Sequence, residues 1–422
     1  MEFSVTRISR GLVAPAEPTP SGVLELSVVD RIPVLRCNAR TLHIFRQGPG
    51  AAQVIRKALS KALIPYYPLA GKLDVSDQNE LQIACSGDGI WFVEALADCT
   101  LDAVNYFDHA ASIPYEKLLP IPPQENDGLD PLVQMQVTQF GCKGFVIGLV
   151  FCHSICDGLG AAQFLSAVGE YARGAQQLSI NPEWCRNFLP ATPPHPKSSA
   201  PPPITLPDYQ LQHVTIDICL DKIKELKQEF QKWSGKTCST FEIAAALLWG
   251  ERTRAIKLKN EARVQLVFFA NCRPLVEPPL PKGFYGNCFF PVNITASSGR
   301  LTEGKGSENV FQVVKLIQEA KAGLPVEFGK WVNKKEGPDP FAPPLEYSTL
   351  FVSEWGRLGF QEVDYGWGSP AHIVPIQGSS VVPAGIVCSP PSPKRGVRLM
   401  TWCVQKPHLA PLLQHMDQYL MQ

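Results

Sequence analysis

The clearest hydrophobic pattern in the chain is a continuous apolar run over 145–152. A run of this length without alternation is typical of a strand buried on both faces. A glycine-punctuated turn follows it, and then apolar residues recur at helical spacing over 164–172. The pattern therefore predicts a buried strand, a turn and an amphipathic helix, in that order.

Similar patterns predict further elements along the first half. Apolar residues at helical spacing occupy 54–63, and the proline that follows ends that helix. Two short apolar runs, 81–85 and 90–93, flank Ser-Gly-Asp-Gly and predict a hairpin. The alternating strand 132–137 and a glycine turn predict a second hairpin with the buried run.

The second half repeats this mixture of elements. Helices are predicted over 223–233, from a capping box at Ser239 towards Arg254, and over 310–320, with a buried strand over 264–270. Between the halves, nine prolines lie from Pro182 to Pro207, which excludes a helix or a central strand there.

The 422 residues exceed one ordinary core, so two α/β domains of similar size are expected. The predicted division is an N-terminal domain over 1–181, a proline-rich crossover loop over 182–213 and a C-terminal domain over 214–422.

Composition narrows the classes of partner. Lys+Arg and Asp+Glu both number 39, so no overall field favours nucleic acid or a membrane surface. The 13 cysteines are scattered without a C-x-x-C pattern, which predicts reduced thiols. The N-terminal residues lack the apolar region of a signal peptide, and no apolar run is long enough to cross a bilayer. We therefore expect a soluble cytoplasmic protein.

The strongest chemical candidate is His153, which directly follows the buried strand. A histidine there can be shielded from water on one side and reachable by substrate on the other, which suits a general base. Asp157 follows four residues later, although such a pair is more often simply part of a turn.

Other kinds of site fit less well. The stretch 158–163 approaches a dinucleotide-binding turn but lacks the third small residue and an acidic partner. No G-x-S-x-G occurs. A strand turns Cys152 away from His153, and Cys156 has no third group to orient it. The remaining histidines are isolated, so we expect no metal site.

A second motif, Asp-Tyr-Gly-Trp-Gly, occupies 364–368. Together with His-x-x-x-Asp-Gly at 153–158, it resembles the BAHD family of plant acyl-CoA-dependent acyltransferases, in which Phe usually stands in place of Tyr365. Further stretches match the family in the same order: 67–73, 239–241, 271–273 and 285–288. The sequences at 104–108 and 278–283 resemble those of one branch of the family, which holds benzyl alcohol benzoyltransferases, taxane acyltransferases and amide-forming relatives.

The resemblance implies two chloramphenicol-acetyltransferase-like domains of mixed sheet and helices, with an active-site channel between them. It implies that His153 deprotonates a small-molecule alcohol or amine, which attacks acyl-CoA through a tetrahedral oxyanion. Acyl-CoA is then a co-substrate, no cofactor is permanently bound, and the protein is a monomer. The acyl group is expected to be aromatic or hydrophobic. The alternatives are a catalytically inactive member that serves as a binding scaffold, and a hydrolase that uses the same base on water.

The resemblance also implies roles for individual residues. Asp364 is a second catalytic candidate after His153, and the site is supported by Asp157, Arg273, Gly158, Gly366 and Trp367. The oxyanion candidates are Trp355 and Ser353, although a tryptophan beside a glycine is often only a packing residue. The candidates for binding coenzyme A are Lys236, Ser239, Thr240 and Asn287. The first three lie at a helix N-terminus, whose N–H groups suit phosphate but also occur in any capped helix.

Overall fold

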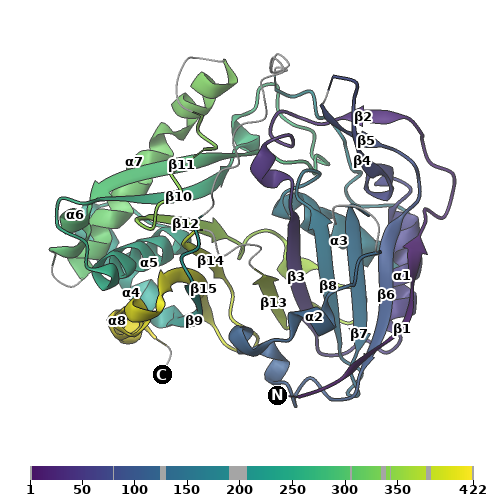
Figure 1. The fold of residues 1–422 in the computed structure, drawn as a ribbon, viewed down its shortest axis with the longest axis horizontal. Coiled ribbons are helices and arrows are strands. Elements are labelled where there is room, and N and C mark those ends of the chain that lie inside the picture. The colour runs from purple at the N-terminus through teal and green to yellow at the C-terminus, as the bar shows by residue number, and fades with distance from the viewer. Residues whose placement is uncertain are drawn as a thin grey trace. The chain divides into compact units, whose positions relative to one another are not determined.

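The computed structural model describes residues 2–78, 80–123, 130–189, 207–304, 307–333, 339–342, 344–376 and 382–420 (Figure 1). The contacts between residues divide the chain into two compact units. Unit 1 comprises Met1–Ser199, Arg273–Cys288 and Arg357–Gly378, and unit 2 comprises Ala200–Cys272, Phe289–Gly356 and Ser379–Gln422. Both units mix strands with helices, as expected for an α/β protein.

The elements of unit 1 are β1 (Val5–Val13), β2 (Val23–Glu25), β3 (Asn38–Phe45), α1 (Ala51–Ala62), β4 (Lys72–Val75), β5 (Leu81–Ala84), β6 (Ile90–Ala97), α2 (Tyr115–Leu118), β7 (Val133–Gln139), β8 (Phe145–Cys152), α3 (Gly158–Ala172) and β13 (His372–Ile376). Its 3-10 helices are η1 (Pro33–Leu35), η2 (Tyr67–Ala70), η3 (Asn105–Phe107), η4 (Ala110–Ser112), η5 (Arg273–Leu275) and η6 (Phe360–Glu362).

The main sheet of unit 1 has the order β1-β6-β7-β8-β3-β13. Every residue of β8 is buried, which confirms the strand predicted from the apolar run. An added Cβ at Gly148, in the middle of β8, would lie 2.0 Å from the carbonyl oxygen of Leu118. Only glycine therefore lets the end of α2 approach the strand this closely. The predicted helices over 54–63 and 164–172 are confirmed as α1 and α3, which pack against each other.

One predicted hairpin is wrong and the other is confirmed. Strands β5 and β6 both exist, but β5 pairs with β2 and β4 in a separate three-stranded sheet. β6 instead pairs with β1 and β7. Local alternation predicts strands but does not select their partners. β7 and β8 do form the second, antiparallel hairpin.

The alternating residues of β7 are buried on both faces. Gln136 is completely buried and donates through Nε2 to the carbonyl of Lys117 (2.8 Å) and to Thr138 Oγ1 (3.0 Å). Arg7 donates in turn to Gln136 Oε1 (3.0 Å). The polar face of β7 is thus paired inside the unit, which offsets the cost of burying it.

The elements of unit 2 are β9 (Leu211–Cys219), α4 (Leu220–Ser234), α5 (Thr240–Ile256), β10 (Arg263–Asn271), β11 (Phe289–Ser297), α6 (Ser298–Thr302), α7 (Ser307–Val332), β12 (Thr349–Glu354), β14 (Ala384–Cys388), β15 (Gly396–Gln405), α8 (Lys406–Met416) and the 3-10 helix η7 (Asp417–Tyr419). The sheet order is β11-β10-β12-β14-β15-β9. α5 is buried almost all round and contacts α4, α7 and α8 as well as the sheet.

The units are not continuous in sequence, unlike the predicted domains. The segments Arg273–Cys288 and Arg357–Gly378 fall within the range expected for the C-terminal domain, but they belong to unit 1. The physical reason for the second is that β13 adds to the main sheet of unit 1 by antiparallel pairing with β3. Of the predicted crossover loop, 190–206 lies outside the described residues, and its last residues begin β9.

Among the described residues, no helix has both the length and the apolar character needed to span a bilayer.

Candidate active site

His153 stands directly after β8, where the strand leaves the sheet of unit 1. Its N–H donates to the carbonyl of Cys37 (2.8 Å), and the next residue, Ser154, donates through Oγ to the carbonyl of Leu35 (3.1 Å). The side chain is half-buried, and its ring centroid lies 6.2 Å from that of Phe151. The backbone of the turn is therefore tied to the segment before β3, while the imidazole stays partly accessible.

Asp157 closes the same turn and begins α3. Its Oδ1 accepts from the N–H of Gly160 (3.0 Å), as an N-cap residue does. Both carboxylate oxygens also accept from Arg273, at 2.8 Å from Nη1 and 2.9 Å from Nη2. Burial alone would lower the pKa of Arg273, but the Asp157 charge outweighs burial and raises it. Asp157 and Arg273, both expected to support the site, thus form an ion pair with each other.

Asn287 was expected to bind coenzyme A, and the structure places it behind the turn that carries His153. Its side chain is completely buried, and Nδ2 donates to Asp30 Oδ1 (2.7 Å) and to the carbonyl of His153 (2.8 Å). These two bonds tie Asn287 to the turn that carries His153. The acid that it contacts, Asp30, carries no motif that would have drawn attention to it in the sequence.

Asp364 was expected to be catalytic, and its position argues against that role. Tyr365 packs on Phe45 and Trp367 packs on Phe145, with ring centroids 5.4 and 5.8 Å apart. Phe45 and Phe145 are paired at the end of β8 opposite to His153, which is roughly 26 Å away along the strand. The motif therefore belongs to the far end of the sheet.

The Asp364 carboxylate instead shapes its own loop. Its Oδ1 accepts from the N–H groups of Gly366 (2.7 Å) and Gly368 (2.8 Å). Burial acts to raise the pKa of Asp364, but these bonds and the Arg173 charge together lower it. Gly366 and Gly368 have φ values of +106° and +89°, which favour glycine. The supporting roles expected for Gly366 and Trp367 thus concern this loop.

The two oxyanion candidates contact each other within unit 2. Trp355 Nε1 donates to Ser353 Oγ (3.1 Å), and both residues are half-buried. An indole N–H that is already bonded would have to exchange this partner before it could stabilise an oxyanion.

The expected coenzyme A candidates of unit 2 surround the start of α5. Ser239 Oγ accepts from the N–H of Glu242 (3.1 Å), and Glu242 accepts from the N–H of Ser239 (2.8 Å), so the predicted capping box is confirmed. Thr240 is the first residue of the helix, and Lys236 is exposed. The buried Glu242 carboxylate at this helix end is paired with Lys321, so its charge is offset within the protein.

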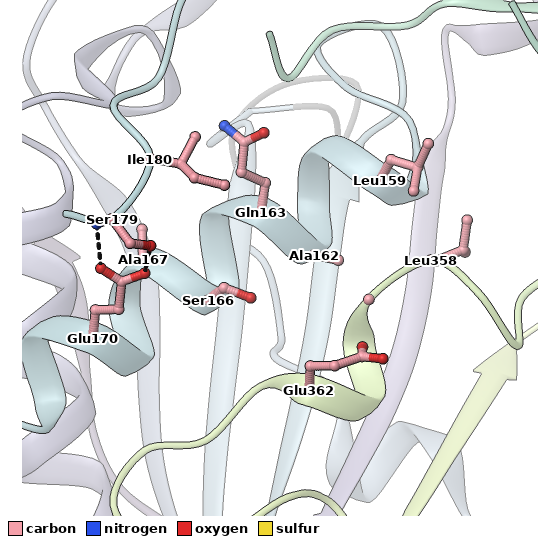
Figure 2. A pocket seen from close by; sticks show the side chains of 11 residues that line it. Leu159, Ala162, Gln163, Ser166, Ala167, Glu170, Ser179, Ile180, Leu358 and Glu362 are labelled. Atoms are coloured by element: carbon pink, nitrogen blue, oxygen red, sulfur yellow. Dashed lines mark hydrogen bonds between the residues drawn. The ribbon is translucent and has the colours of Figure 1, made fainter. Parts of the chain in front are cut away.

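Gly158, the first residue of α3, lies against Leu358: an added Cβ would lie 2.6 Å from Leu358 Cδ1. A pocket of about 300 Å³ begins beside this contact and follows the outer face of α3 (Figure 2). Figure 2 shows Glu170 accepting from Ser179 along its wall. His153 does not line this pocket. The pocket is lined by two carboxylates, Glu170 and Glu362, whose negative charge makes it unsuitable for phosphate.

The neighbouring cysteines are poor nucleophiles. Burial raises the pKa of the Cys152 thiol to about 12 and that of Cys156 well above its ordinary value. Both thiols therefore stay protonated near neutral pH. None of the 13 cysteines, all of which are described, forms a disulfide. Within the described ranges, no three His, Cys, Asp or Glu side chains are grouped to hold a metal ion.

Comparisons with known proteins agree over nearly the whole chain. A family profile described as the Transferase family matches residues 3–418. Acyl transferase 4 of Oryza sativa subsp. japonica is 43% identical, with 97% of each chain covered. The 3'-N-debenzoyl-2'-deoxytaxol N-benzoyltransferase of Taxus canadensis is 34% identical over 89% of this chain and 86% of its own.

Solved structures confirm the fold class. Vinorine synthase superposes with a TM-score of 0.75 at 20% identity, covering 99% of this chain and 98% of its own. TRI101 of F. sporotrichioides, complexed with coenzyme A and T-2, gives 0.68 at 13% identity, covering 94% and 98%. These likenesses support the expected chloramphenicol-acetyltransferase-like α/β fold.

The Asp157–Arg273 pair is testable by a double-mutant cycle. Asp157→Asn and Arg273→Gln should each destabilise the protein, by an amount on the order of 3–5 kcal/mol because each leaves a buried charge without its partner. The double variant should cost clearly less than the sum, because one loss already removes the shared bonds. Urea unfolding measures all four free energies. Strict additivity, or an Arg273→Gln enzyme with full turnover, would contradict a structural pair.

For Asp364, Asn is the informative replacement because it keeps the Oδ1 acceptor. Asp364→Asn should retain most acyl-transfer turnover, whereas a catalytic carboxylate would not tolerate the change. Because folding lowers the pKa of Asp364, its charge stabilises the fold above the ordinary value of 3.8, and this contribution is lost as the pH falls through the lowered pKa. Thermal unfolding of wild type and variant should therefore differ at pH 7 and converge in acid.

Proposed function

We propose a reaction for this chain from one premise: it belongs to the BAHD family of transferases and is an acyltransferase. It transfers an acyl group from acyl-CoA to a hydroxyl or amine of a small plant metabolite. The observation that carries the proposal is His153, a half-buried imidazole on a turn whose backbone and closing acid are both bonded in place.

His153 acts as the general base. One ring nitrogen takes the proton of the acceptor O–H or N–H as the acceptor atom attacks the thioester carbonyl, and a tetrahedral oxyanion forms. The C–S bond then breaks, the carbonyl re-forms, and the coenzyme A sulfur leaves with the proton that His153 had taken. No covalent enzyme intermediate is required, which accords with the protonated state of Cys152 and Cys156.

The reactions of three relatives support the proposed classes of acyl group and acceptor. One relative is a caffeoyltransferase acting on a myricetin glycoside in Crocosmia x crocosmiiflora, and it is 38% identical over 99% of this chain. The Taxus canadensis relative is an N-benzoyltransferase, and a Taxus cuspidata relative is a taxadien-5-alpha-ol O-acetyltransferase. An aromatic or hydrophobic acyl group, and either O- or N-acylation, fit this range.

Other parts of the proposal concern unit 2 and the cell. Trp355 or Ser353 supplies the oxyanion donor once their mutual bond is exchanged. Lys236, Ser239 and Thr240 contact the coenzyme A phosphates, supported only by the charge of Lys236 and the helix end. Coenzyme A in complexes of TRI101 supports acyl-CoA as the co-substrate. A cytoplasmic monomer without membrane attachment stays a prediction.

The decisive test replaces His153 with Ala. Turnover of acyl-CoA with pooled plant alcohols and amines, read by product mass, should fall at least ~10²–10⁴-fold because the base is lost. The matched control is His109→Ala, at an exposed histidine on unit 1, which should keep full turnover.

The outcomes separate the alternatives. Near-normal turnover of folded His153→Ala would overturn the proposed mechanism. If the wild type released free acid and formed no ester or amide, a hydrolase would replace the transferase. No turnover of any acyl-CoA by wild type would favour a binding scaffold.

A further inference from the structure

A second buried charge pair lies beside the turn that carries His153. Asp30, in the loop between β2 and η1, is completely buried, and Arg186 is 5% exposed. Arg186 Nε lies 3.1 Å from Asp30 Oδ2, as an ion pair rather than a well-directed hydrogen bond. Both residues belong to unit 1.

The Asp30 carboxylate is otherwise fully used. Oδ2 accepts from the N–H (3.0 Å) and Oγ (2.7 Å) of Ser27. Oδ1 accepts from Nδ2 of Asn287 (2.7 Å) and from its N–H (3.3 Å). The acid is thus held by its own loop on one side and by Asn287 on the other.

Arg186 sits in an aromatic box. Its guanidinium carbon lies 4.2 Å from the ring centroid of Trp184, 5.3 Å from that of Phe284 and 5.2 Å from that of Tyr285. An added Cβ at Gly286 would lie 1.5 Å from Arg186 Nη1, so any other residue there would displace the guanidinium. The three rings and Gly286 therefore hold the Arg186 guanidinium in one position.

Arg186 and Asn287, the two side chains that contact Asp30, each donate a hydrogen bond to a backbone carbonyl of the turn that carries His153. Arg186 Nη2 donates to the carbonyl of Ile155 (2.7 Å), and Asn287 Nδ2 donates to the carbonyl of His153 (2.8 Å). The residue after Asn287 completes the arrangement, because the N–H of Cys288 lies 3.3 Å from Asp157 Oδ2. The consecutive residues Asn287 and Cys288 therefore bond to Asp30 and to Asp157, respectively.

A purely stabilising role is a poor explanation for this cluster. Buried ion pairs contribute little net stability because desolvation offsets their attraction, and apolar residues of similar volume often do as well or better. What the cluster does supply is direction: two donors aimed at two carbonyls of one short turn. A side chain on a turn held at both carbonyls keeps one orientation.

We propose that Asp30, Arg186 and Asn287 are positioning residues for His153. Asn287 holds the histidine's own carbonyl, Arg186 holds that of Ile155, and Asp30 orients both donors. The inference rests on the proposed role of His153 as the base, and it adds residues that act on the reaction only through that base.

The test compares Asn287→Ala with a matched buried pair elsewhere. Asp217 and Arg398 in unit 2 form a bidentate pair, with Oδ1 2.7 Å from Nε and Oδ2 2.6 Å from Nη2, far in the chain from any residue of the turn. Asn287→Ala and Asp217→Asn are assayed for the thermal midpoint, for kcat, and for KM of the acyl-CoA.

A misplaced base slows the chemical step without weakening the binding of acyl-CoA. Asn287→Ala should therefore lower kcat by about 10- to 100-fold, with KM changed by less than about twofold. Asp217→Asn should lower the midpoint and leave kcat unchanged at temperatures where it is folded. Wild-type kcat in folded Asn287→Ala, or equal losses of kcat in both variants, would overturn the inference.

If Asn287→Ala does not fold, Arg186→Lys decides instead. It keeps a positive charge opposite Asp30 but removes the Nη2 donor to Ile155, so kcat should again fall while KM is kept. Full kcat in Arg186→Lys would overturn the inference. The His153→Ala variant distinguishes failure of the proposed function from failure of this inference. If His153→Ala keeps its activity, His153 is not the base. If His153→Ala is inactive but Asn287→Ala is fully active, His153 is the base and only the positioning role is wrong.

Discussion

The bidentate ion pair between Asp157 and Arg273 is the contact on which the rest of the site depends. It joins two residues that are 116 positions apart in the chain. Arg273 begins the segment that ends at Cys288, and this segment joins unit 1 although the strands before and after it belong to unit 2. By fixing the start of the segment, the pair brings Gly286, Asn287 and Cys288 to the turn behind His153.

Two acids and two arginines then surround that turn, and their formal charges cancel. Each acid is also met by backbone N–H groups, so no carboxylate relies on its arginine alone. The imidazole itself follows a strand that is buried along its whole length. A strand buried along its length and a turn held by bonds from distant segments together give the base a defined place, which is what catalysis by a positioned group requires.

Much of this was predictable from the sequence, and the exceptions have physical causes. The strand 145–152 and the helix after it follow from apolar periodicity, because burial on one or both faces leaves a direct record in residue order. Pairing leaves no such record, so the predicted partner of β5 was wrong. The roles of Asp30 and Arg186 could not be predicted, because the burial and pairing of a charged side chain depend on residues far away in the chain. Asn287 and Asp364 were found by motif, but motifs mark positions without saying what the side chain contacts.

The central claim is that the turn behind His153 is rigid because side chains from distant segments bond to it. Hydrogen exchange of the peptide covering residues 150–160, followed by mass spectrometry, tests this most directly. The N–H groups of His153 and Gly160 are bonded to Cys37 and Asp157, so the peptide should exchange slowly, at rates near those of the core strands. In Arg273→Gln the same peptide should exchange much faster while peptides from α5 are unchanged. Exchange of the wild-type peptide at the rate of an exposed loop would contradict the account.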